Sequence, residues 1–349
     1  MGRCAQVGVV SVPAIVGAIV LGQVVATAGR TLQSEAPRAP AGAVVGIGNF
    51  THIVSNLDRF LEFYHDVLGL ELTAPARPWD TNAAILNLAN APGAQYRFVS
   101  LKIPGSALGV EAVEYKDIDR KPVAPRLQDP GAANLILQVR DIDGLMARLN
   151  KAGARIVSAG GKPATIDRNG RKARVVFVQD PDGFFVELSQ REAVPATPAP
   201  AASNVIGGSF VITVDDTDRS MRFYREALGF QPQVGASFEG TKLLMDTAGT
   251  PDAQFRRSAS QIPGTTVEMV FLEFKNIDRK PMRTRFRDPG TAVLQLRVRD
   301  ADGVMKLLKA AGGEVVSADG QAVNLGSAMR LALVRDPNNL FLELIQTLQ

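Results

Sequence analysis

Two glutamates on matching segments are the residues of this chain best placed to do chemistry. Glu187 and Glu343 lie near the ends of segments 180–188 (DPDGFFVEL) and 336–344 (DPNNLFLEL), each between two apolar residues. Because side chains alternate between the two faces of a strand, each glutamate faces away from those apolar neighbours. A carboxylate in a partly apolar site is costly unless it is paired. Glu187 and Glu343 are therefore candidates for ligand contact, and Glu187 for a general base; the alternative is a structural ion pair with an arginine such as Arg297.

The chain contains only two histidines, His52 and His65. His52 shares a strand face with Phe50 and Val54, which predicts a core position under the following helix. A bulge that turned His52 to the other face would make it a candidate metal ligand. His65 falls on the polar side of that helix and is predicted to be solvated. A histidine-based metal centre and Ser–His–Asp hydrolysis are therefore not expected.

Several other functional classes lack the residues that they need. The single cysteine, Cys4, leaves no disulfide within the chain, no Cys-rich zinc site and no CxxC pair. No P-loop is present, and no GxGxxG joins a strand to a helix. The net charge of +4 is spread over interspersed basic and acidic residues, which argues against nucleic-acid binding. A length of 349 residues with 46% hydrophobic residues predicts two globular domains.

The elements that position the glutamates form a repeated unit. Residues 44–54 alternate as a strand, and a helix with an apolar stripe follows and ends at Gly69. A second strand at 134–139 leads into a helix at 142–152. Each helix is followed by three predicted strands, so the order β-α-β-β-β runs twice within residues 44–192.

The whole pattern returns close to 160 residues later. KDIDRKP (116–122) returns as KNIDRKP (275–281), and the segment that holds Glu187 returns as the segment that holds Glu343. An offset that persists along a domain indicates tandem duplication, here of four modules in all. We therefore predict a first domain at 44–192, a Pro/Ala linker at 193–204 and a second domain at 205–349.

The N-terminal residues have the layout of a secretory signal peptide. Arg3 precedes an apolar run at 7–25, and Ala26-Thr27-Ala28 fits a cleavage site. We predict a signal peptide at 1–28, a flexible tether at 29–43 and export to the periplasm or medium, without membrane contact after cleavage. An uncleaved N-terminal membrane anchor is the alternative, although the run is at the short limit for a span.

The ordered motifs resemble the vicinal oxygen chelate superfamily, which includes glyoxalase I, the bleomycin resistance proteins and the extradiol dioxygenases. Its FYxxxLG helix end matches Phe63-Tyr64…Leu68-Gly69 and Phe223-Tyr224…Leu228-Gly229, and its DPDGxxxEL strand matches 180–188 and 336–344. The resemblance covers about residues 46–190 and 206–347. It implies an α+β fold of two tandem glyoxalase-like domains. Each would contain two paired β-α-β-β-β modules whose sheets form an incomplete barrel with the helices outside.

The resemblance also implies a divalent metal held by side chains from the first and last strand of each module. In the first domain these positions fall on Asn49, Glu111, Asn134 and Glu187, and in the second on Ser209, Val270, Val293 and Glu343. The histidines of the family pattern are missing from both sets. The first set offers oxygen ligands alone, which suits Mg, Mn or Ca rather than zinc. Extradiol dioxygenase chemistry is not expected, because its iron needs two histidines and a carboxylate.

Arg297 and two aromatic residues could complete a ligand site with the glutamates. Tyr96 lies in an aromatic and basic segment at 94–97 that could rim the barrel opening, or could be an ordinary strand. Trp79 lies in a Pro-rich connection and is a candidate lid residue.

The predicted function is an exported protein of the bleomycin-resistance type that binds a small molecule, as a monomer or homodimer, without a cofactor. The alternative is a glyoxalase-type lyase, isomerase or epimerase that uses Glu111 and Glu187 with an oxygen-bound metal to polarise a carbonyl or hydroxyl group. A third possibility is a structural or interaction role for the second domain.

Overall fold

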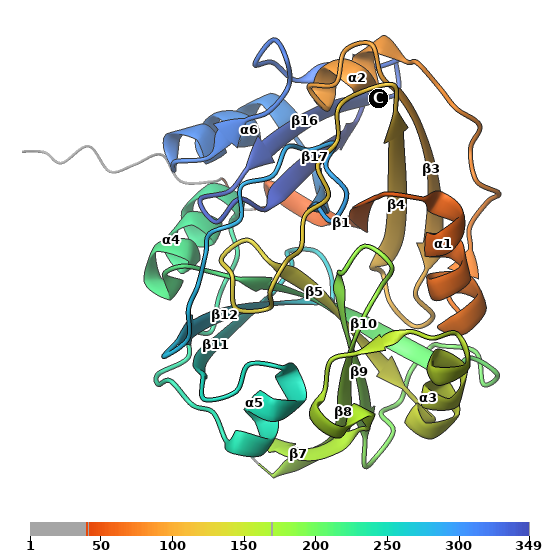
Figure 1. Ribbon diagram of the computed structural model, residues 1–349. Helices are drawn as coiled ribbons and strands as arrows, with labels where there is room; N and C mark the ends of the chain where they lie inside the picture. The colour runs from red at the N-terminus through yellow and green to blue at the C-terminus, as the bar shows by residue number, and fades with distance from the viewer. Residues whose placement is uncertain (1–39, 41, 169, 349) are drawn as a thin grey trace, which may run out of the picture. The chain divides into compact units, whose positions relative to one another are not determined.

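The computed structural model describes residues 40, 42–168 and 170–348, which belong to one compact unit (Figure 1). The predicted signal peptide and most of the predicted tether lie outside the described residues. No helix in the described part of the chain is long and apolar enough to cross a membrane.

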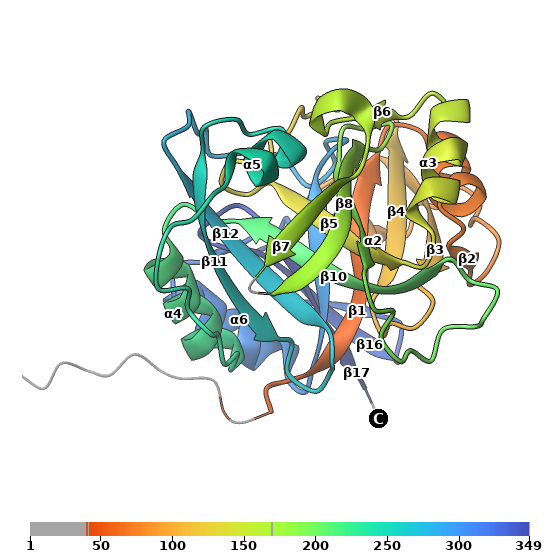
Figure 2. The ribbon, with the colours of Figure 1, turned by 90° about the horizontal axis from the view of Figure 1, so that it is seen from below.

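The described strands form two sheets (Figures 1 and 2). Sheet A has nine strands: β1 (Val44–Val54), β2 (Glu71–Leu72), β3 (Gln95–Lys102), β4 (Gly109–Lys116), β13 (Ala292–Val298), β14 (Glu314–Val315), β15 (Val323–Leu325), β16 (Met329–Arg335) and β17 (Phe341–Thr347). Sheet B has eight: β5 (Ala133–Val139), β6 (Arg155–Ile156), β7 (Ala164–Arg168), β8 (Arg171–Gln179), β9 (Phe185–Arg191), β10 (Val205–Thr213), β11 (Gln254–Gln261) and β12 (Glu268–Lys275). The predicted α+β class is therefore confirmed.

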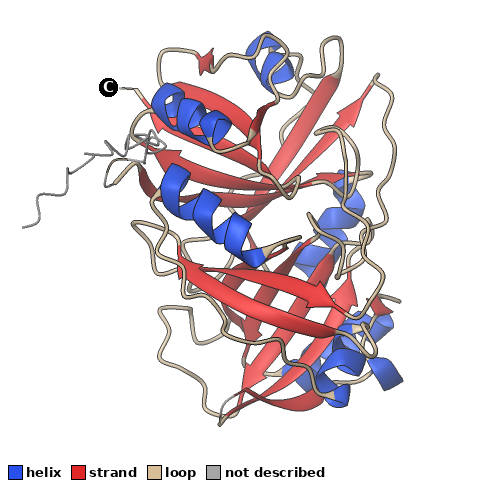
Figure 3. Cartoon of the chain, turned by 90° about the vertical axis from the view of Figure 1, so that its left-hand side faces the viewer, coloured by secondary structure: helices blue, strands red, loops and turns tan. Residues whose placement is uncertain are grey.

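The helices, shown in blue in Figure 3, either follow the first strand of a module or pack against the concave face of a sheet. They are α1 (Leu57–Leu61), which continues as a π-helix over Glu62–Val67, α2 (Ala83–Leu88), α3 (Ile142–Lys151), α4 (Thr217–Leu228), α5 (Lys242–Ala248) and α6 (Ala301–Ala310). Local chemistry sets their ends. The Asn56 side chain accepts a hydrogen bond from the Arg59 amide at the start of α1, and Gly229 ends α4 with a positive φ of 73°.

The pairing of the modules differs from the prediction. Sheet A runs in the order β14-β16-β17-β13-β1-β4-β3-β2, so it joins the first module to the fourth. Sheet B joins the second module to the third through the antiparallel pair β10 and β5. The expectation that consecutive modules pair within each sequence repeat is therefore wrong. A sequence repeat identifies modules of common origin, whereas the edges of the first strands decide which modules share a sheet.

The outer faces of the two sheets share one hydrophobic core with α1, α3, α4 and α6. The rings of Phe50 in β1 and Phe210 in β10 lie 4.5 Å apart between centroids, so the sheets touch directly at this point. The concave faces have separate clusters, to which α2 contributes in sheet A and α5 in sheet B. Each sheet thus has a packed outer face and a concave face that could hold a site.

The two family motifs meet each other across the sheets. The Tyr64 hydroxyl, from the helix after β1, donates to Asp180 Oδ2 at 3.2 Å, just before β9 of sheet B. The Tyr224 hydroxyl donates to Asp336 Oδ2 at 2.8 Å in the matching place. All four side chains are buried. These hydrogen bonds fix the helix ends of one sheet to the turns of the other.

Both histidines lie where the residue pattern placed them. His52 is buried in the outer core, with Nδ1 3.4 Å from Asp180 Oδ2 and from the Tyr64 hydroxyl, so its predicted core position is confirmed. His65 is partly exposed, and its Nδ1 lies 2.7 Å from the carbonyl oxygen of Leu70. Neither ring reaches a concave face.

We expect Tyr224→Phe and Tyr64→Phe each to lower the free energy of unfolding by about 1–3 kcal/mol, because each leaves a buried carboxylate with one hydrogen bond fewer. Denaturant unfolding measures the effect. Tyr96→Phe is the control, since its hydroxyl donates at 3.2 Å to Asp80, which is exposed. A Tyr224→Phe protein no less stable than the Tyr96→Phe protein would contradict this role.

Candidate functional site

A pair of carboxyl groups bridged by an amide lies on the concave face of sheet A. Gln295 Nε2, from β13, donates to Glu111 Oε1 of β4 at 2.9 Å and to Glu343 Oε2 of β17 at 3.0 Å. The orientation of the amide is set by the main chain, because Gln295 Oε1 accepts a hydrogen bond from the Asn49 amide at 2.9 Å. An amide held in this way presents its NH2 group to the two carboxyl groups.

Glu111 has further donors around it. Thr51 Oγ1 donates to Oε1 at 3.1 Å, Ser100 Oγ to Oε2 at 3.0 Å and Asn49 Nδ2 to Oε2 at 3.4 Å. Hydrogen bonds of this kind favour the charged form of a carboxyl group. Glu111 is thus surrounded by groups that suit a carboxylate.

The two carboxyl groups differ in how they hold a proton. Burial raises the pKa of Glu343 to about 7, and the nearby charge of Glu111 adds to the effect, while the Gln295 hydrogen bond opposes it. Burial also raises the pKa of Glu111, but hydrogen bonds from Ser100, Thr51, Gln295 and Asn49 oppose the rise. The pKa of Glu343 therefore lies near neutral pH, whereas the hydrogen bonds around Glu111 favour the charged form of its carboxyl group.

A bulge in β1 makes room for this arrangement. The register of β1 against β13 shifts between Ile47 and Phe50, and this shift turns the main-chain N–H of Asn49 toward Gln295. A Cβ atom at Gly48 would lie 2.7 Å from Gln295 Oε1 and 2.9 Å from its Cβ. Position 48 must therefore be glycine for the Gln295 side chain to pack against the β1 backbone there.

The surroundings of the pair are apolar and partly open. Phe98, Val113 and Ile345 lie on the same face of sheet A and are only partly buried, as are Glu111 and Glu343. A few polar groups among partly exposed apolar side chains are typical of sites that bind small molecules. The arrangement can accept and donate a proton, or hydrogen-bond to an oxygen of a ligand.

The matching place in sheet B is packed rather than polar. There Val270 stands where Glu111 stands in sheet A, Ile136 where Gln295 stands, and Glu187 where Glu343 stands. These residues, with Asn134, line a cavity of about 40 Å3 that α5 helps to enclose. A space of that size suits water rather than an organic ligand.

The structure divides the predicted oxygen-ligand set between the two sheets. Asn49 and Glu111 lie in sheet A and are hydrogen-bonded to each other, whereas Asn134 and Glu187 line the cavity of sheet B. In the second repeat, Ser209 and Val270 lie in sheet B and Glu343 in sheet A. Each set is divided between the two sheets because modules of different repeats pair with each other.

The predicted ligand-binding residues outside this network lie in other surroundings. Arg297 is exposed, and its Nε donates to the carbonyl oxygen of Ile47 at 3.2 Å. Tyr96 is buried in the concave core. Trp79 lies beneath two cations, 5.0 Å from Arg97 Cζ and 4.3 Å from Lys116 Nζ. Because Arg97 also pairs with Asp58 of α1, we place Trp79 on the outer side of sheet A rather than over the site.

Gln295, Thr51 and Ser100 are the site residues that sequence reasoning missed. The prediction placed a ligand at Val293, two residues before Gln295 on the same face of β13. The signal was available, since Gln295 is a polar residue flanked by Leu294 and Leu296, as Glu343 is flanked by Leu342 and Leu344.

Comparison with known proteins places this geometry in a family. A sequence model of the Glyoxalase/Bleomycin resistance protein/Dioxygenase superfamily matches residues 46–188 and 208–344. The chain belongs to this superfamily. Proteins similar to it include a lactoylglutathione lyase of Arabidopsis thaliana, GLX1, which is 25% identical over 52% of this chain and 55% of its own length. Another is a 2-epi-5-epi-valiolone epimerase of Actinomyces sp, 28% identical over 41% of this chain and 78% of that protein.

The fold agrees with solved structures of the superfamily. Glyoxalase I from Zea mays matches with a TM-score of 0.57 and 16% identity, over 86% of this chain and 92% of that chain. This likeness supports the tandem glyoxalase-like fold with curved sheets. The chain spans about half the length of the plant lyases that it matches.

The superfamily implies a divalent metal at positions that in sheet A are occupied by Asn49, Glu111, Val293 and Glu343, and these residues, with the bridging Gln295, fit it poorly. The network contains no histidine, and its one bridging amide turns nitrogen, which cannot ligate a metal, toward both carboxyl groups. Among the described residues, no group of three or more His, Cys, Asp and Glu side chains could hold a metal ion. These side chains therefore do not fit a divalent metal ion.

We expect Glu343→Gln to raise the melting temperature at pH 8 by a few degrees and to change it little at pH 4. The pKa of the Glu343 carboxyl group is about 7 in the folded protein and ordinarily 4.5, so the folded state binds the proton more tightly than the unfolded state does. This tighter binding stabilises the folded protein, fully at pH values below 4.5, and the contribution is lost as the pH rises through 7. Glutamine stays neutral and avoids that loss. Thermal unfolding at both pH values measures it, and the exposed variant Glu71→Gln controls for the lost charge. An equal effect of Glu343→Gln at both pH values would contradict the assignment.

Proposed function

We propose that this protein binds a small organic molecule on the concave face of sheet A without a transition metal. The observation that carries the proposal is the Gln295 amide that joins Glu111 and Glu343 beside partly exposed apolar side chains. With Glu343 protonated and Glu111 charged, the pair would offer a donor and an acceptor side by side. The ligand class that suits it carries neighbouring hydroxyl or carbonyl oxygens.

The proposal includes two expectations from the sequence. The protein acts after export, and it works as a monomer or homodimer. Sheet B then has a structural role, because its matching positions are filled mainly by apolar side chains.

We expect protein purified without chelator to contain no stoichiometric zinc, iron, nickel or cobalt by elemental analysis. In a thermal-shift screen of small uncharged hydroxy ketones and vicinal diols, at least one compound should raise the melting temperature. Gln295→Leu should abolish the shift, because it removes the bridge between the carboxyl groups.

Glu187→Gln, at the matching position of sheet B, is the control and should keep the shift. Stoichiometric metal that is lost on Glu343→Ala would overturn the metal-free proposal. Loss of the ligand shift in Glu187→Gln rather than in Gln295→Leu would move the site to sheet B.

A second candidate function is proton transfer at a carbon next to a carbonyl group, as in an isomerase or epimerase. The pKa of about 7 for Glu343 favours it, because a general base works best when its pKa lies near the working pH. The Glu343 carboxylate would take the proton from carbon, leaving the electron pair on the carbonyl oxygen as an enolate. Return of the proton to either face of that carbon would give back the substrate or its epimer.

We expect a compound found in the screen to exchange its carbon-bound proton for deuterium in D2O, measured by NMR. Glu343→Gln should slow this exchange by about 10²–10⁴-fold, the usual contribution of a general base. The wild-type rate should rise with pH through about 7. A compound that binds but does not exchange its carbon-bound proton would be consistent with the binding function and would contradict the proposed enzymatic function.

A further inference from the structure

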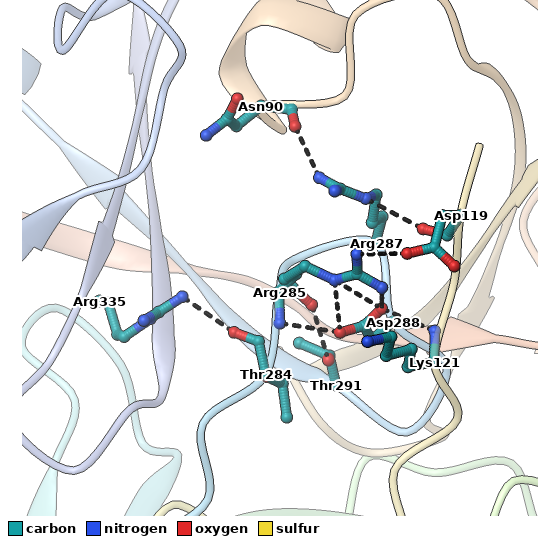
Figure 4. A network of polar contacts seen from close by, with 9 residues as sticks. All are labelled: Asn90, Asp119, Lys121, Thr284, Arg285, Arg287, Asp288, Thr291 and Arg335. Atoms are coloured by element: carbon teal, nitrogen blue, oxygen red, sulfur yellow. Dashed lines mark hydrogen bonds and ion pairs between the residues drawn. The ribbon is translucent and has the colours of Figure 1, made fainter.

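A groove separate from the carboxyl pair lies at the end of sheet A. It has a volume of about 520 Å3, within the range of small-molecule sites. Its walls are the turn after α2 (Ala89, Asn90 and Pro92), the segment 285–287 that precedes β13, the edge at 314–317 and Arg335 at the end of β16. Figure 4 shows the polar contacts that hold Arg285, Arg287 and Arg335 here. The groove is therefore rich in guanidinium groups.

Arg335 has a buried donor that its protein partners leave unused. Its NH2 group donates to the Thr284 carbonyl oxygen at 2.9 Å, and its guanidinium lies 4.9 Å from the centre of the Phe341 ring. The side chain is 15% exposed, and Nε has no hydrogen-bond partner among the described residues. Its ion pair with Glu314 is long, at 3.4 Å, and Glu314 is 66% exposed. This contact with Glu314 is the one ion pair of Arg335 among the described residues, so an anion in the groove could take the place of the exposed Glu314 carboxylate.

Arg287 is positioned by the main chain rather than by a carboxylate. Its Nε donates to the Asp119 carbonyl oxygen at 3.1 Å, and its NH1 to the Asn90 carbonyl oxygen at 2.9 Å. Arg285 differs, because Asp288 at 2.6 Å and Asp119 at 2.8 Å pair with it. Carbonyl partners hold a guanidinium in place while leaving its positive charge available to an anion.

The internal duplication shows that the fold does not need these two arginines. The first repeat has Gln128 at the position of Arg287 and Gln179 at the position of Arg335. Gln128 Nε2 reaches the Asp278 carbonyl oxygen at 3.4 Å, and Gln179 Nε2 donates to the Gly183 carbonyl oxygen at 2.8 Å. A neutral amide therefore fills both positions in the same scaffold.

We propose that this groove binds the anionic group of a small molecule, a phosphate or a carboxylate, between Arg287 and Arg335. A guanidinium group donates two parallel hydrogen bonds to such oxygens, and these bonds are stronger than neutral ones. Glu314, at the groove's exposed edge, competes with the anion for Arg335. The site is distinct from the carboxyl pair, which repels anions.

Calorimetric titration of the full chain with inorganic phosphate and, separately, with citrate tests the proposal at low ionic strength. We expect saturable binding of one of the two, which identifies the anion class, and weakening with added salt. Arg335→Gln and Arg287→Gln, which copy the first repeat, should each weaken binding about tenfold. Glu314→Gln should tighten it.

Arg330→Gln is the matched control, because it removes the same charge from β16 but pairs with Asp302 outside the groove. It should keep wild-type affinity, and so should Glu343→Gln, which separates this site from the proposed function. Absence of binding by both anions would overturn the proposal. So would equal losses in Arg330→Gln and Arg335→Gln, since these would show a general effect of charge.

Discussion

The antiparallel pairing of β1 with β13 is the contact on which the candidate site depends. It aligns Phe50 with Leu294 and Thr51 with Val293, although these residues are more than 240 positions apart in the sequence. Because β1 also pairs with β4, and β13 with β17, four adjacent strands bring Glu111, Asn49, Gln295 and Glu343 to one place. Joining distant segments costs little extra entropy, since the cost of closing a loop grows only with the logarithm of its length. A site built from the two ends of the chain is therefore no less stable in principle than one built within a repeat.

The duplication has kept its structural contacts in both halves and its polar site in one. The hydrogen bonds Tyr64–Asp180 and Tyr224–Asp336 recur because each ties a helix end in one sheet to a turn in the other. The concave faces have no such constraint. Sheet A holds amide-bridged carboxyl groups there, whereas α5 and apolar side chains leave only a small cavity in sheet B. The side chains that line the sheet B cavity are mainly apolar, and close packing of such side chains stabilises a protein interior.

Local sequence patterns predicted most of the fold but only part of the candidate site. Alternation in β1, the stop at Gly69 and the repeated DPDG-type turn each report on short-range chemistry, so the modules could be predicted. Which module pairs with which could not be predicted, because no local sequence pattern identifies the strand edge that forms the pair. A tandem repeat suggests instead that each module pairs with its neighbour in the sequence. The mistaken set of Asn49, Glu111, Asn134 and Glu187 follows from that one step. Gln295 was missed for a smaller reason: residues two apart on a strand share a face, so register decides between them.

Under the proposed metal-free function, the carboxyl pair must avoid repulsion between two negative charges in another way. Both bonds from Gln295 Nε2 are short, so the two bonded oxygens lie no more than about 6 Å apart. Two full charges at about that distance repel by about 3 kcal/mol at an effective dielectric constant of about 20. A divalent cation would remove that repulsion, but a shared proton removes it as well, and burial adds to the preference for the protonated form. The Gln295 amide favours the proton over a cation. Its NH2 group occupies the space between the two carboxyl groups, and it offers them hydrogen atoms rather than a lone pair that could bind a cation.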